Sequence, residues 1–181
     1  RAQRAYTALV PTQLARLLAS AEGRQALTRF DAVLLGGADA PESLLALARS
    51  SGASVVTTYG MSETAGGCVY DGRALVGSRV ELDHDGRIRL GGATLAQGYL
   101  GEPELTAESF RQDADGTPWF QTDDVGHLEG GLLIVDGRID ELINTGGVKV
   151  APGQVEAALI QLDSINAAIV VGTPHDEWGQ A

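Results

Sequence analysis

The chain has 181 residues, of which 44% are hydrophobic, and its formal net charge at pH 7 is −11. Such a length and composition predict a globular protein with one hydrophobic core or two unequal ones. The acidic balance argues against sequence-independent binding to nucleic acid or to an anionic membrane, because both require basic patches. No apolar run approaches the roughly 20 residues of a membrane span, and the single cysteine, Cys68, fits a reducing cytosol. We expect a cytoplasmic protein with no nucleic-acid partner and no membrane insertion.

The first 75 residues predict part of an α/β nucleotide-binding subdomain. A helix opens at Pro11 and is expected to stop at Gly23, and residues 31–35 predict a fully buried strand. A second helix runs from near Pro41 to Gly52, and its expected buried residues are Leu44, Leu45, Leu47 and Ala48. The apolar residues 53–56 follow it, so the order strand, helix, strand predicts a βαβ unit with parallel strands.

Residues 76–139 predict an antiparallel, barrel-like β subdomain. Its expected strands are residues 78–82, 87–90, 119–122 and 132–135, with a short helix over residues 102–110. Asp85-Gly86 and Asp136-Gly137 are predicted as hairpin-type turns between or after these strands.

Residues 140–181 predict the beginning of a mobile C-terminal α+β domain. It is expected to hold a strand at residues 148–150, a helix that starts at Pro152 and a strand at residues 167–171. The apolar stripe of that helix comprises Val155, Ala158, Leu159 and Leu162. The predicted fold class is therefore mixed α/β, in three parts with boundaries after residues 75 and 139.

The chain is organised around the segment that follows residues 53–56, Thr57-Thr58-Tyr59-Gly60-Met61-Ser62-Glu63-Thr64-Ala65-Gly66-Gly67. We expect a buried strand here, followed by a loop at the edge of the sheet where the strands end. Open α/β sheets bind their ligands in crevices at that edge. The loop offers an aromatic ring in Tyr59, a hydroxyl in Ser62 and a carboxylate in Glu63. Together they suit a nucleotide with its divalent cation. An ordinary strand-to-loop corner is the alternative.

Several other chemistries are disfavoured. Gly60-Met61-Ser62-Glu63-Thr64 lacks the final glycine of a nucleophile elbow, and the three histidines are far apart in sequence, which argues against a serine hydrolase. Asp83-His84-Asp85-Gly86 has Gly92 where a calcium loop needs glutamate, so a hairpin turn is the better interpretation. Neither a Walker-type lysine loop nor G-x-G-x-x-G occurs. Cys68 has no metal-spaced partner and is predicted to be a small buried apolar residue.

Four motifs follow one another along the chain: Gly36-Gly37-Ala38, Tyr59-Gly60-Met61-Ser62-Glu63, Thr122-Asp123-Asp124-Val125-Gly126, and Gly137-Arg138-Ile139-Asp140, which continues to Asn144-Thr145-Gly146-Gly147-Val148-Lys149-Val150. Their order and spacing resemble the adenylate-forming superfamily of acyl-CoA ligases, luciferases and peptide-synthetase adenylation domains. The resemblance implies two half-reactions. A carboxylate attacks the α-phosphorus of ATP to give an acyl-adenylate and pyrophosphate, and a thiol, usually that of coenzyme A, then displaces AMP. No protein nucleophile is needed, since such an enzyme contributes positioning and charge stabilisation.

The resemblance also implies roles for individual residues. In adenylation these are nucleotide binding by Gly36, Gly37, Ala38 and Gly60, adenine stacking by Tyr59, α-phosphate contact by Ser62, magnesium binding by Glu63, ribose binding by Asp124, and ribose and phosphate contact by Arg138. In thioester formation, Asp140 matches the hinge, and Gly146 and Gly147 match the loop that lines the pantetheine tunnel. The predicted catalytic residues are Glu63, Ser62 and Arg138. Taken singly, Asp124 could equally cap or solvate a turn, and Arg138 could pair with a surface acid.

Within the superfamily, residues 59–72 and Thr122-Asp123-Asp124 resemble the o-succinylbenzoate–CoA ligases of menaquinone biosynthesis in their actinobacterial form. That resemblance implies a bulky aromatic dicarboxylate as the acid, with Gly66, Gly67, Cys68 and Val69 bordering its ring; tight loop packing explains the small residues equally well. ATP, Mg²⁺ and coenzyme A are then the expected cofactors, and a homodimer is left open. The other interpretations are a ligase for another aryl or fatty acid, an adenylation domain that loads a carrier protein, and a non-catalytic nucleotide-binding module.

Two elements of the superfamily are missing from these residues: the Ser/Thr/Gly-rich phosphate loop with its lysine, and the adenylation lysine near the C-terminus. Lys149 lies in the wrong motif to replace the second lysine. The chain starts at Arg1 and stops soon after an expected strand, so we expect it to be part of a longer polypeptide. These 181 residues alone are expected to show no substrate-dependent pyrophosphate exchange.

Overall fold

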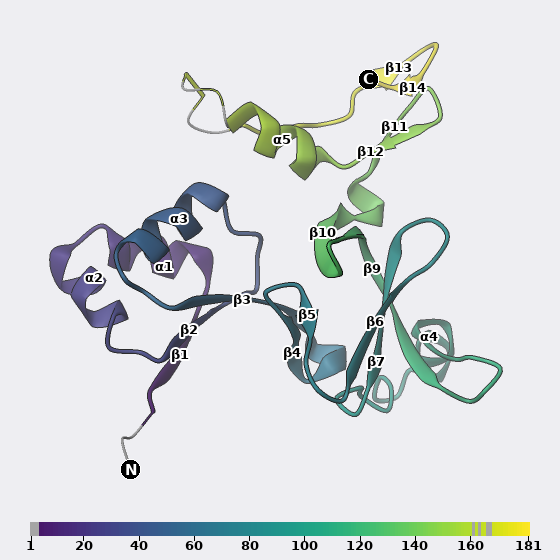
Figure 1. The fold of residues 1–181 in the computed structure, drawn as a ribbon. Helices are drawn as coiled ribbons and strands as arrows, with labels where there is room; N and C mark the ends of the chain where they lie inside the picture. The colour runs from purple at the N-terminus through teal and green to yellow at the C-terminus, as the bar shows by residue number, and fades with distance from the viewer. Residues whose placement is uncertain (1–3, 161, 163, 166–167) are drawn as a thin grey trace. The chain divides into compact units, whose positions relative to one another are not determined.

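The computed structural model describes residues 4–160, 162, 164–165 and 168–181. The chain divides into two compact units, the first made of Arg1–Ser78 and Ala93–Ala96, the second of Arg79–Gly92 and Gln97–Ala181. The elements of both units are labelled in Figure 1. The predicted division into residues 1–75, 76–139 and 140–181 stays a prediction.

The first unit is built on a mixed sheet whose strand order is β1-β2-β3-β4-β5. The strands are β1 (Tyr6–Leu9), β2 (Ala32–Leu35), β3 (Val55–Met61), β4 (Gly66–Tyr70) and β5 (Arg73–Ala74). β1, β2 and β3 are parallel, with Leu9 opposite Leu35 and Leu35 opposite Thr57, whereas β4 runs antiparallel to β3. The predicted βαβ unit is therefore confirmed, and its parallel strands end at the same edge, beside Gly36 and Thr58.

Three helices lie against one face of the parallel strands (Figure 1). They are α1 (Pro11–Leu18), α2 (Ala21–Leu27) and α3 (Glu42–Ser50). The shared core consists of Leu14, Leu18, Leu27, Val33, Leu35, Leu45, Ala48, Ala53 and Val55. The expectation that Leu47 is buried is wrong, because its side chain is 51% exposed. Leu45 and Ala48, three positions apart as on one face of a helix, are the buried residues of α3, and Leu44 packs against the same core while only partly buried.

The expectation that Gly23 ends the first helix is also wrong. α1 ends at Leu18, and Ser20 caps a second helix by accepting a hydrogen bond at its Oγ from the Gly23 backbone N at 3.0 Å. Gly23 lies inside α2 and is buried, and a Cβ built on it would be 2.1 Å from the backbone oxygen of Leu17. The glycine therefore permits a close approach between α1 and α2 instead of stopping a helix.

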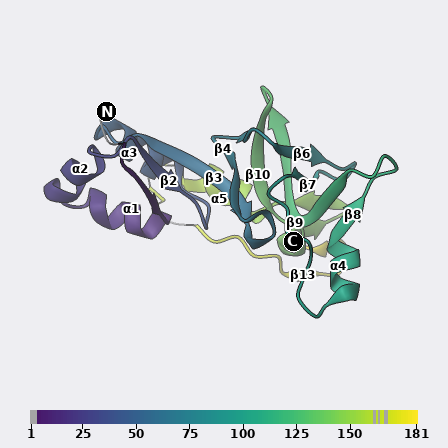
Figure 2. The ribbon, with the colours of Figure 1, turned by 90° about the horizontal axis from the view of Figure 1, so that it is seen from below.

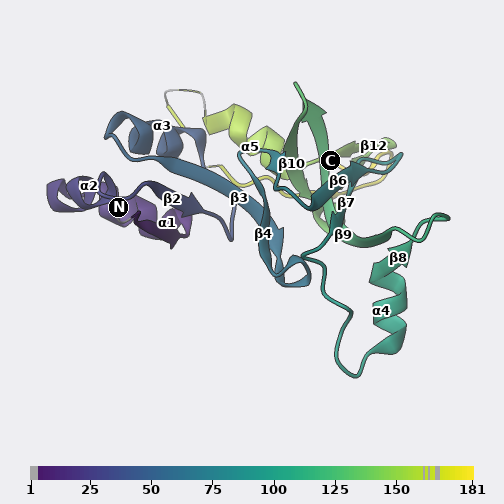
Figure 3. The same cartoon turned by 60° about the horizontal axis from the view of Figure 1, so that its bottom comes forward.

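The second unit contains a five-stranded antiparallel sheet around the long strand β9 (Figure 2). Its elements are β6 (Ser78–Leu82), β7 (Arg87–Gly92), α4 (Pro103–Ser109), β8 (Phe110–Gln112), β9 (Pro118–Glu129) and β10 (Leu132–Arg138). α4 leads directly into β8, as Figure 3 shows. The predicted strands and helix are confirmed, although β9 and β10 are longer than expected. Buried residues of this sheet include Ile88, Leu90, Trp119, Phe120 and Val125.

The two Asp-Gly pairs predicted as hairpin turns have different structures. Asp85-Gly86 does form the turn between β6 and β7, where Gly86 N donates to Asp83 O at 3.0 Å. Asp136-Gly137, by contrast, lies within β10, where Val135 pairs with Gly126 and Gly137 with Val125. Asp136 is thus the extra residue of a β-bulge, and the prediction of a turn is wrong. The β9–β10 hairpin closes instead at Gly130 and Gly131, both with positive φ.

The last part of the second unit holds short elements. They are the 3₁₀ turn η2 (Ile139–Glu141), β11 (Ile143–Thr145), β12 (Val148–Val150), α5 (Pro152–Ile160), β13 (Pro174–His175) and β14 (Gly179–Gln180). The strand at 148–150 and the helix start at Pro152 are confirmed. Leu162 lies beyond the helix it was expected to belong to, and its side chain is 55% exposed. Of the strand predicted at 167–171, Ala167 lies outside the described residues, and residues 168–171 form no strand.

Within the described part of the chain, none of the helices combines the length and apolar character needed to cross a membrane.

Replacing Gly23 by alanine is expected to destabilise the protein by about 1–3 kcal/mol, because the added Cβ would meet the backbone oxygen of Leu17. A helical glycine ordinarily gives the opposite result, a gain of roughly 0.5–1 kcal/mol on replacement by alanine. Gly153→Ala in α5 is the matched control, since its Cβ would lie 3.7 Å from Asp136 O, an ordinary contact. Urea denaturation followed by circular dichroism measures both. A Gly23→Ala protein as stable as the parent contradicts the close approach of α1 and α2.

Candidate functional site

The predicted site residues are divided between the two units. The first unit carries Gly36, Gly37, Ala38, Tyr59, Gly60, Ser62, Glu63, Gly66, Gly67 and Cys68. The second carries Asp124, Arg138, Asp140, Gly146 and Gly147.

In the first unit, the segment after β2 lies directly against β3. Gly36 N donates to Leu9 O at 3.2 Å, and a Cβ at Gly36 would lie 2.3 Å from Thr58 Oγ1. Thr58 Oγ1 in turn donates to Leu35 O at 3.2 Å. Only glycine fits at position 36, so the segment Gly36-Gly37-Ala38 is held beside the residue that precedes Tyr59. The structure therefore brings together two of the motifs that the sequence singled out.

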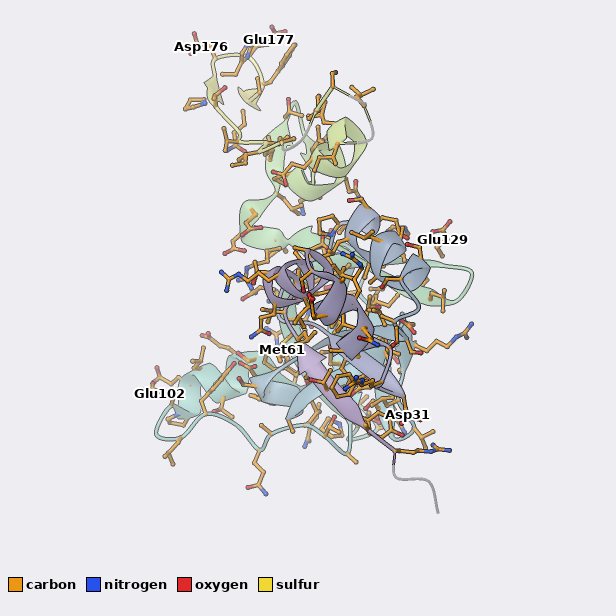
Figure 4. The ribbon with its side chains drawn as sticks, turned by 90° about the vertical axis from the view of Figure 1, so that its left-hand side faces the viewer. Asp31, Met61, Glu102, Glu129, Asp176 and Glu177 are labelled. Carbon is orange, nitrogen blue, oxygen red and sulfur yellow. The ribbon has the colours of Figure 1, made fainter. Side chains whose placement is uncertain are left out.

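The turn that carries Ser62 and Glu63 is held by a buried threonine hydroxyl. It is the 3₁₀ turn η1 (Ser62–Thr64), which begins directly after Met61 at the end of β3 (Figure 4). Thr64 is 2% exposed, and its Oγ1 accepts from Met61 N at 3.0 Å and donates to Gly66 O at 2.8 Å. The Glu63 carbonyl also accepts from Ala96 N at 2.8 Å. The backbone that presents Ser62, which is exposed, and Glu63, which is half-buried, is thus fixed from both sides.

The glycines of this segment are needed for close backbone contacts. A Cβ at Gly60 would lie 2.1 Å from Gly66 O, across the β3–β4 pair. A Cβ at Gly67 would lie 3.0 Å from the Tyr70 ring and 3.3 Å from Thr58 Cβ. Packing therefore accounts for Gly60 and Gly67 without any ligand, and a role for Gly66 and Gly67 in an acyl pocket stays a prediction.

Cys68 is buried, as its apolar character predicted. The residue is 1% exposed, and burial raises the pKa of its thiol, although a hydrogen bond with the Thr64 side chain works against the shift. The thiol is therefore protonated at neutral pH and protected from reagents. Whether Cys68 also borders an acyl pocket stays a prediction.

In the second unit, Asp124 lies at an irregularity of the central strand. On β7, Arg87 pairs with Val125 and Arg89 with Gln121, so three residues of β9, Thr122 to Asp124, face the single residue Ile88. Extra residues of this kind bend a strand and redirect its side chains, and they are frequent beside active sites. The Asp124 side chain is 15% exposed.

Thr122 provides the hydrogen bonds that the irregular pairing lacks. It is 1% exposed, and its Oγ1 donates to Ile88 O at 2.8 Å and accepts from Asp124 N at 3.1 Å. A buried hydroxyl that both donates and accepts a hydrogen bond holds the backbone in one conformation. Because Asp124 is two residues further on, its position depends on that hydroxyl.

Arg138 lies opposite Asp124 and is surrounded by carboxylates. The two residues are partners in the β9–β10 register, with Arg138 NH1 3.9 Å from Asp124 Oδ1. The same guanidinium has its NH2 3.7 Å from Asp123 Oδ2 and donates from Nε to Asp140 Oδ1 at 2.9 Å. The structure thus brings together Asp124, Arg138 and Asp140, three of the predicted residues of this unit.

The hydrogen bond between Arg138 and Asp140 shifts the pKa of both groups. It raises the pKa of Arg138, against the effect of burial, and it lowers the pKa of Asp140. Asp140 is therefore ionised at neutral pH, and the contribution of the pair to stability is lost only as the pH falls through the lowered pKa of that carboxyl. Both side chains are largely exposed, so this contribution is small.

The bulge before Arg138 carries a histidine–carboxylate pair. His127 Nδ1 lies 2.9 Å from Asp136 Oδ2, and Asp136 is the extra residue of β10. This hydrogen bond, with the negative charge behind it, raises the pKa of His127 above its ordinary value of 6.5. The sequence signal for the pair was weak, since Asp136-Gly137 looked like a turn.

Gly146 and Gly147 form the two-residue turn between β11 and β12. Their φ angles are +58° and +85°, which suits a type I′ hairpin, and Gly146 N donates to Trp178 O at 3.0 Å. The turn accounts for both glycines, and their role beside a pantetheine chain stays a prediction.

The described residues include no cluster of three or more His, Cys, Asp or Glu side chains that could hold a metal ion. A magnesium ion that is bound with a nucleotide needs less, because one or two carboxylates and the substrate phosphates commonly suffice. The single carboxylate of Glu63 on its fixed turn fits that requirement.

Sequence reasoning missed several residues that shape the site. Thr64 and Thr122 hold the two irregular segments, and Arg87 and Asp123 form an ion pair at 2.6 Å beside Arg138. No sequence pattern pointed to the Arg87–Asp123 pair or to the hydrogen bond from Thr122 to Ile88, since these partners lie far apart in sequence. Thr64, by contrast, bonds to its near neighbours Met61 and Gly66. Asp71 was signalled by Asp71-Gly72, the turn between β4 and β5, and its carboxylate accepts from Thr57 N at 2.8 Å.

Thr122→Val is expected to lower stability by about 1–3 kcal/mol, because it leaves the Ile88 carbonyl and the Asp124 amide unsatisfied in a buried place. Thr122→Ser keeps the hydroxyl and loses one methyl group, so it should cost about 1 kcal/mol. Urea denaturation of the two variants measures the difference. Equal losses would show that packing, and not the hydroxyl, holds the bulge.

The His127–Asp136 pair is expected to make stability depend on pH. A raised histidine pKa means that the contribution is fully present below pH 6.5 and disappears as the pH rises through the raised value. Asp136→Asn should return the pKa of His127 toward 6.5, as an NMR titration of the imidazole would measure. Glu104→Gln, on α4, is the control that should leave it unchanged. A His127 pKa that is insensitive to Asp136→Asn is the contrary result.

No protein-family model matches the chain. It is 47% identical over 180 residues to the probable 2-succinylbenzoate–CoA ligase of Mycobacterium tuberculosis strain H37Rv, a match that covers 98% of this chain and 45% of that protein. The chain thus spans less than half the length of this curated relative.

Solved structures of similar enzymes also match the chain over nearly its whole length. E. coli MenE with a bound analogue of OSB-AMS superposes with a TM-score of 0.78 and 30% identity, over 99% of this chain and 40% of that one. The o-succinylbenzoate CoA synthetase of Bacillus subtilis, in complex with the acyl-adenylate intermediate OSB-AMP, gives a TM-score of 0.80 and 28% identity over 97% and 40%. The mixed α/β fold and the sequence similarity extend over nearly all of this chain, which therefore belongs to the adenylate-forming family.

Proposed function

We propose that the complete polypeptide containing this chain is an ATP-dependent, AMP-forming 2-succinylbenzoate–CoA ligase. The observation that carries the proposal is the 47% identity to a protein named as this ligase, over 98% of the chain. The fold supports it, because the B. subtilis structure that it matches holds the acyl-adenylate OSB-AMP.

The reaction proceeds in two steps. In the first, a carboxylate oxygen of 2-succinylbenzoate attacks the α-phosphorus of ATP, and the bond to pyrophosphate breaks to leave the acyl-adenylate. In the second, the sulfur of coenzyme A attacks the acyl carbon and AMP leaves, which yields the thioester. Neither step needs a nucleophile from the protein, so the work of the side chains is to position the reactants and to stabilise charge.

Asp124 and Arg138 are proposed to hold the ribose and a phosphate of the nucleotide. A carboxylate can accept hydrogen bonds from two neighbouring hydroxyls at once, as the ribose offers them. The 15% exposure of Asp124 and its buried anchor at Thr122 supply the fixed geometry that such binding requires. Arg138 NH1 lies close enough to Asp124 to share the same ligand.

The first unit is proposed to bind the base, the α-phosphate and the metal. Tyr59 would stack on adenine, with Gly36, Gly37, Ala38 and Gly60 beside the base, and the Ser62 hydroxyl would reach the α-phosphate. Glu63 would hold Mg²⁺, which neutralises charge on the phosphates when it is bound. The support is local: Gly36 lies against Thr58, next to Tyr59, and the Thr64 hydroxyl fixes the turn of Ser62 and Glu63.

The acid and the thiol are proposed to use the glycine-rich segments. Gly66, Gly67 and Cys68 would border the aromatic ring of the acid, and Gly146 and Gly147 would line the passage for the pantetheine chain. Asp140, which follows the sheet at η2, is the proposed hinge. The exposed β11–β12 turn leaves both of its glycines open to a ligand.

In the complete polypeptide, Asp124→Asn is expected to raise the KM for ATP roughly 10- to 100-fold, since hydrogen bonds to a charged group are worth about 1.5–3 kcal/mol. Glu63→Gln should raise the magnesium concentration that gives half-maximal activity. Glu129→Gln, an exposed charge change on β9, is the matched control and should leave both values unchanged. The measurement is thioester formation from ATP, coenzyme A and 2-succinylbenzoate. Unaltered ATP and magnesium dependence in both variants, or a preference of the parent for benzoate or fatty acids, would refute the proposal.

A further inference from the structure

Arg87, on β7, binds to the irregular segment of β9, residues 122–124. Its Nε donates to the Thr122 carbonyl, and its NH2 lies 2.6 Å from Asp123 Oδ1. Thr122 thus has both its hydroxyl and its carbonyl held by β7, the first by Ile88 and the second by Arg87. The Arg87 side chain is 30% exposed, so the pair with Asp123 is partly shielded from water.

Asp123 connects this fastened segment to Arg138. Its Oδ1 pairs with Arg87, and its other oxygen, Oδ2, lies 3.7 Å from Arg138 NH2. One carboxylate therefore bridges two arginines that belong to two different strands, β7 and β10. The bridge crosses β9 at the residue directly before Asp124.

Arg138 also has a competing partner. Asp140 accepts from Arg138 Nε at 2.9 Å and from NH2 at 3.4 Å, so NH2 lies near two carboxylates, those of Asp140 and Asp123. Arg138 NH1 lies 3.9 Å from Asp124 Oδ1. The Arg138 guanidinium is held by two carboxylates besides Asp124, those of Asp123 and Asp140. Without Asp123, Asp140 alone would hold the guanidinium in its orientation toward Asp124.

We propose that Asp123 is a positioning residue, which acts through Arg138: by tying Arg138 to Arg87 it keeps the guanidinium directed toward the nucleotide site at Asp124. The inference rests on the proposed function, since it takes Arg138 to contact the nucleotide.

The alternative, that Asp123 acts only as a nearby negative charge, predicts the opposite sign. AMP and ATP are anions, so removal of a neighbouring carboxylate lowers the repulsion and should tighten binding. Loss of a positioning residue weakens it. The direction of the change in Asp123→Asn therefore separates the two roles.

The test measures AMP affinity by calorimetry on the complete polypeptide, which requires no turnover. Asp123→Asn is expected to weaken AMP binding roughly two- to fivefold, the range that partly exposed ion pairs support, and to raise the KM for ATP by a similar factor with little change in kcat. Asp123→Glu keeps the carboxylate and should restore most of the affinity. Glu129→Gln, which removes the same charge from the end of β9 (Figure 4), should change nothing.

The decisive comparison is made in an Arg138→Gln background. If Asp123 acts through Arg138, adding Asp123→Asn to Arg138→Gln causes no further loss of AMP affinity. The same two- to fivefold loss in that background, or unchanged or tighter AMP binding in Asp123→Asn alone, overturns the inference. A parent protein that binds AMP but makes no thioester refutes the proposed function alone, and one that binds no AMP refutes both.

Discussion

At two places in this protein, regular strand pairing is interrupted, and a buried threonine hydroxyl there makes hydrogen bonds to backbone groups that lack a strand partner. Thr64 does so at the turn after β3, and Thr122 does so at the irregular part of β9. Each hydroxyl accepts from one backbone amide and donates to one carbonyl, so the buried polar groups are satisfied although the chain leaves regular geometry. The residues proposed to bind magnesium and ribose, Glu63 and Asp124, are adjacent to these two points. Rigid departures from regular strands thus present the polar side chains.

Charge in the second unit is arranged around one arginine. Arg138 has Asp123, Asp124 and Asp140 within 4 Å, in a chain whose formal net charge is −11. Such a guanidinium is held by several acids at once, which limits its motion but also lowers the positive potential that an anionic nucleotide meets. A carboxylate beside this arginine therefore has two opposed effects, one on position and one on potential. Their relative size decides whether its loss weakens or tightens the binding of a nucleotide.

Membership of the adenylate-forming family rests on similarity over nearly the whole chain, while the chain spans less than half the length of its relatives. The relatives are the basis of the proposed reaction, and the geometry supports the proposed roles of particular residues. That support differs among them. Asp124 and Arg138 face each other across two paired strands, whereas the glycines at 60, 67, 146 and 147 are already required by close contacts or by a turn. A glycine of this kind is weak evidence for a ligand, and a fixed carboxylate–guanidinium pair is stronger evidence.

The sequence by itself determined the parallel βαβ unit, most of the strands and the order of the motifs, because these follow from local periodicity and turn residues. Only the tertiary structure decided the role of residues whose partners are distant. Gly23 looked like a helix stop and instead makes room for the Leu17 backbone, and Asp136 looked like a turn and instead is a bulge. The bridge from Arg87 through Asp123 to Arg138 joins residues up to about 50 positions apart, which no local pattern records. Glycine and Asp-Gly permit several conformations, and it is the neighbouring strand or helix that selects one of them.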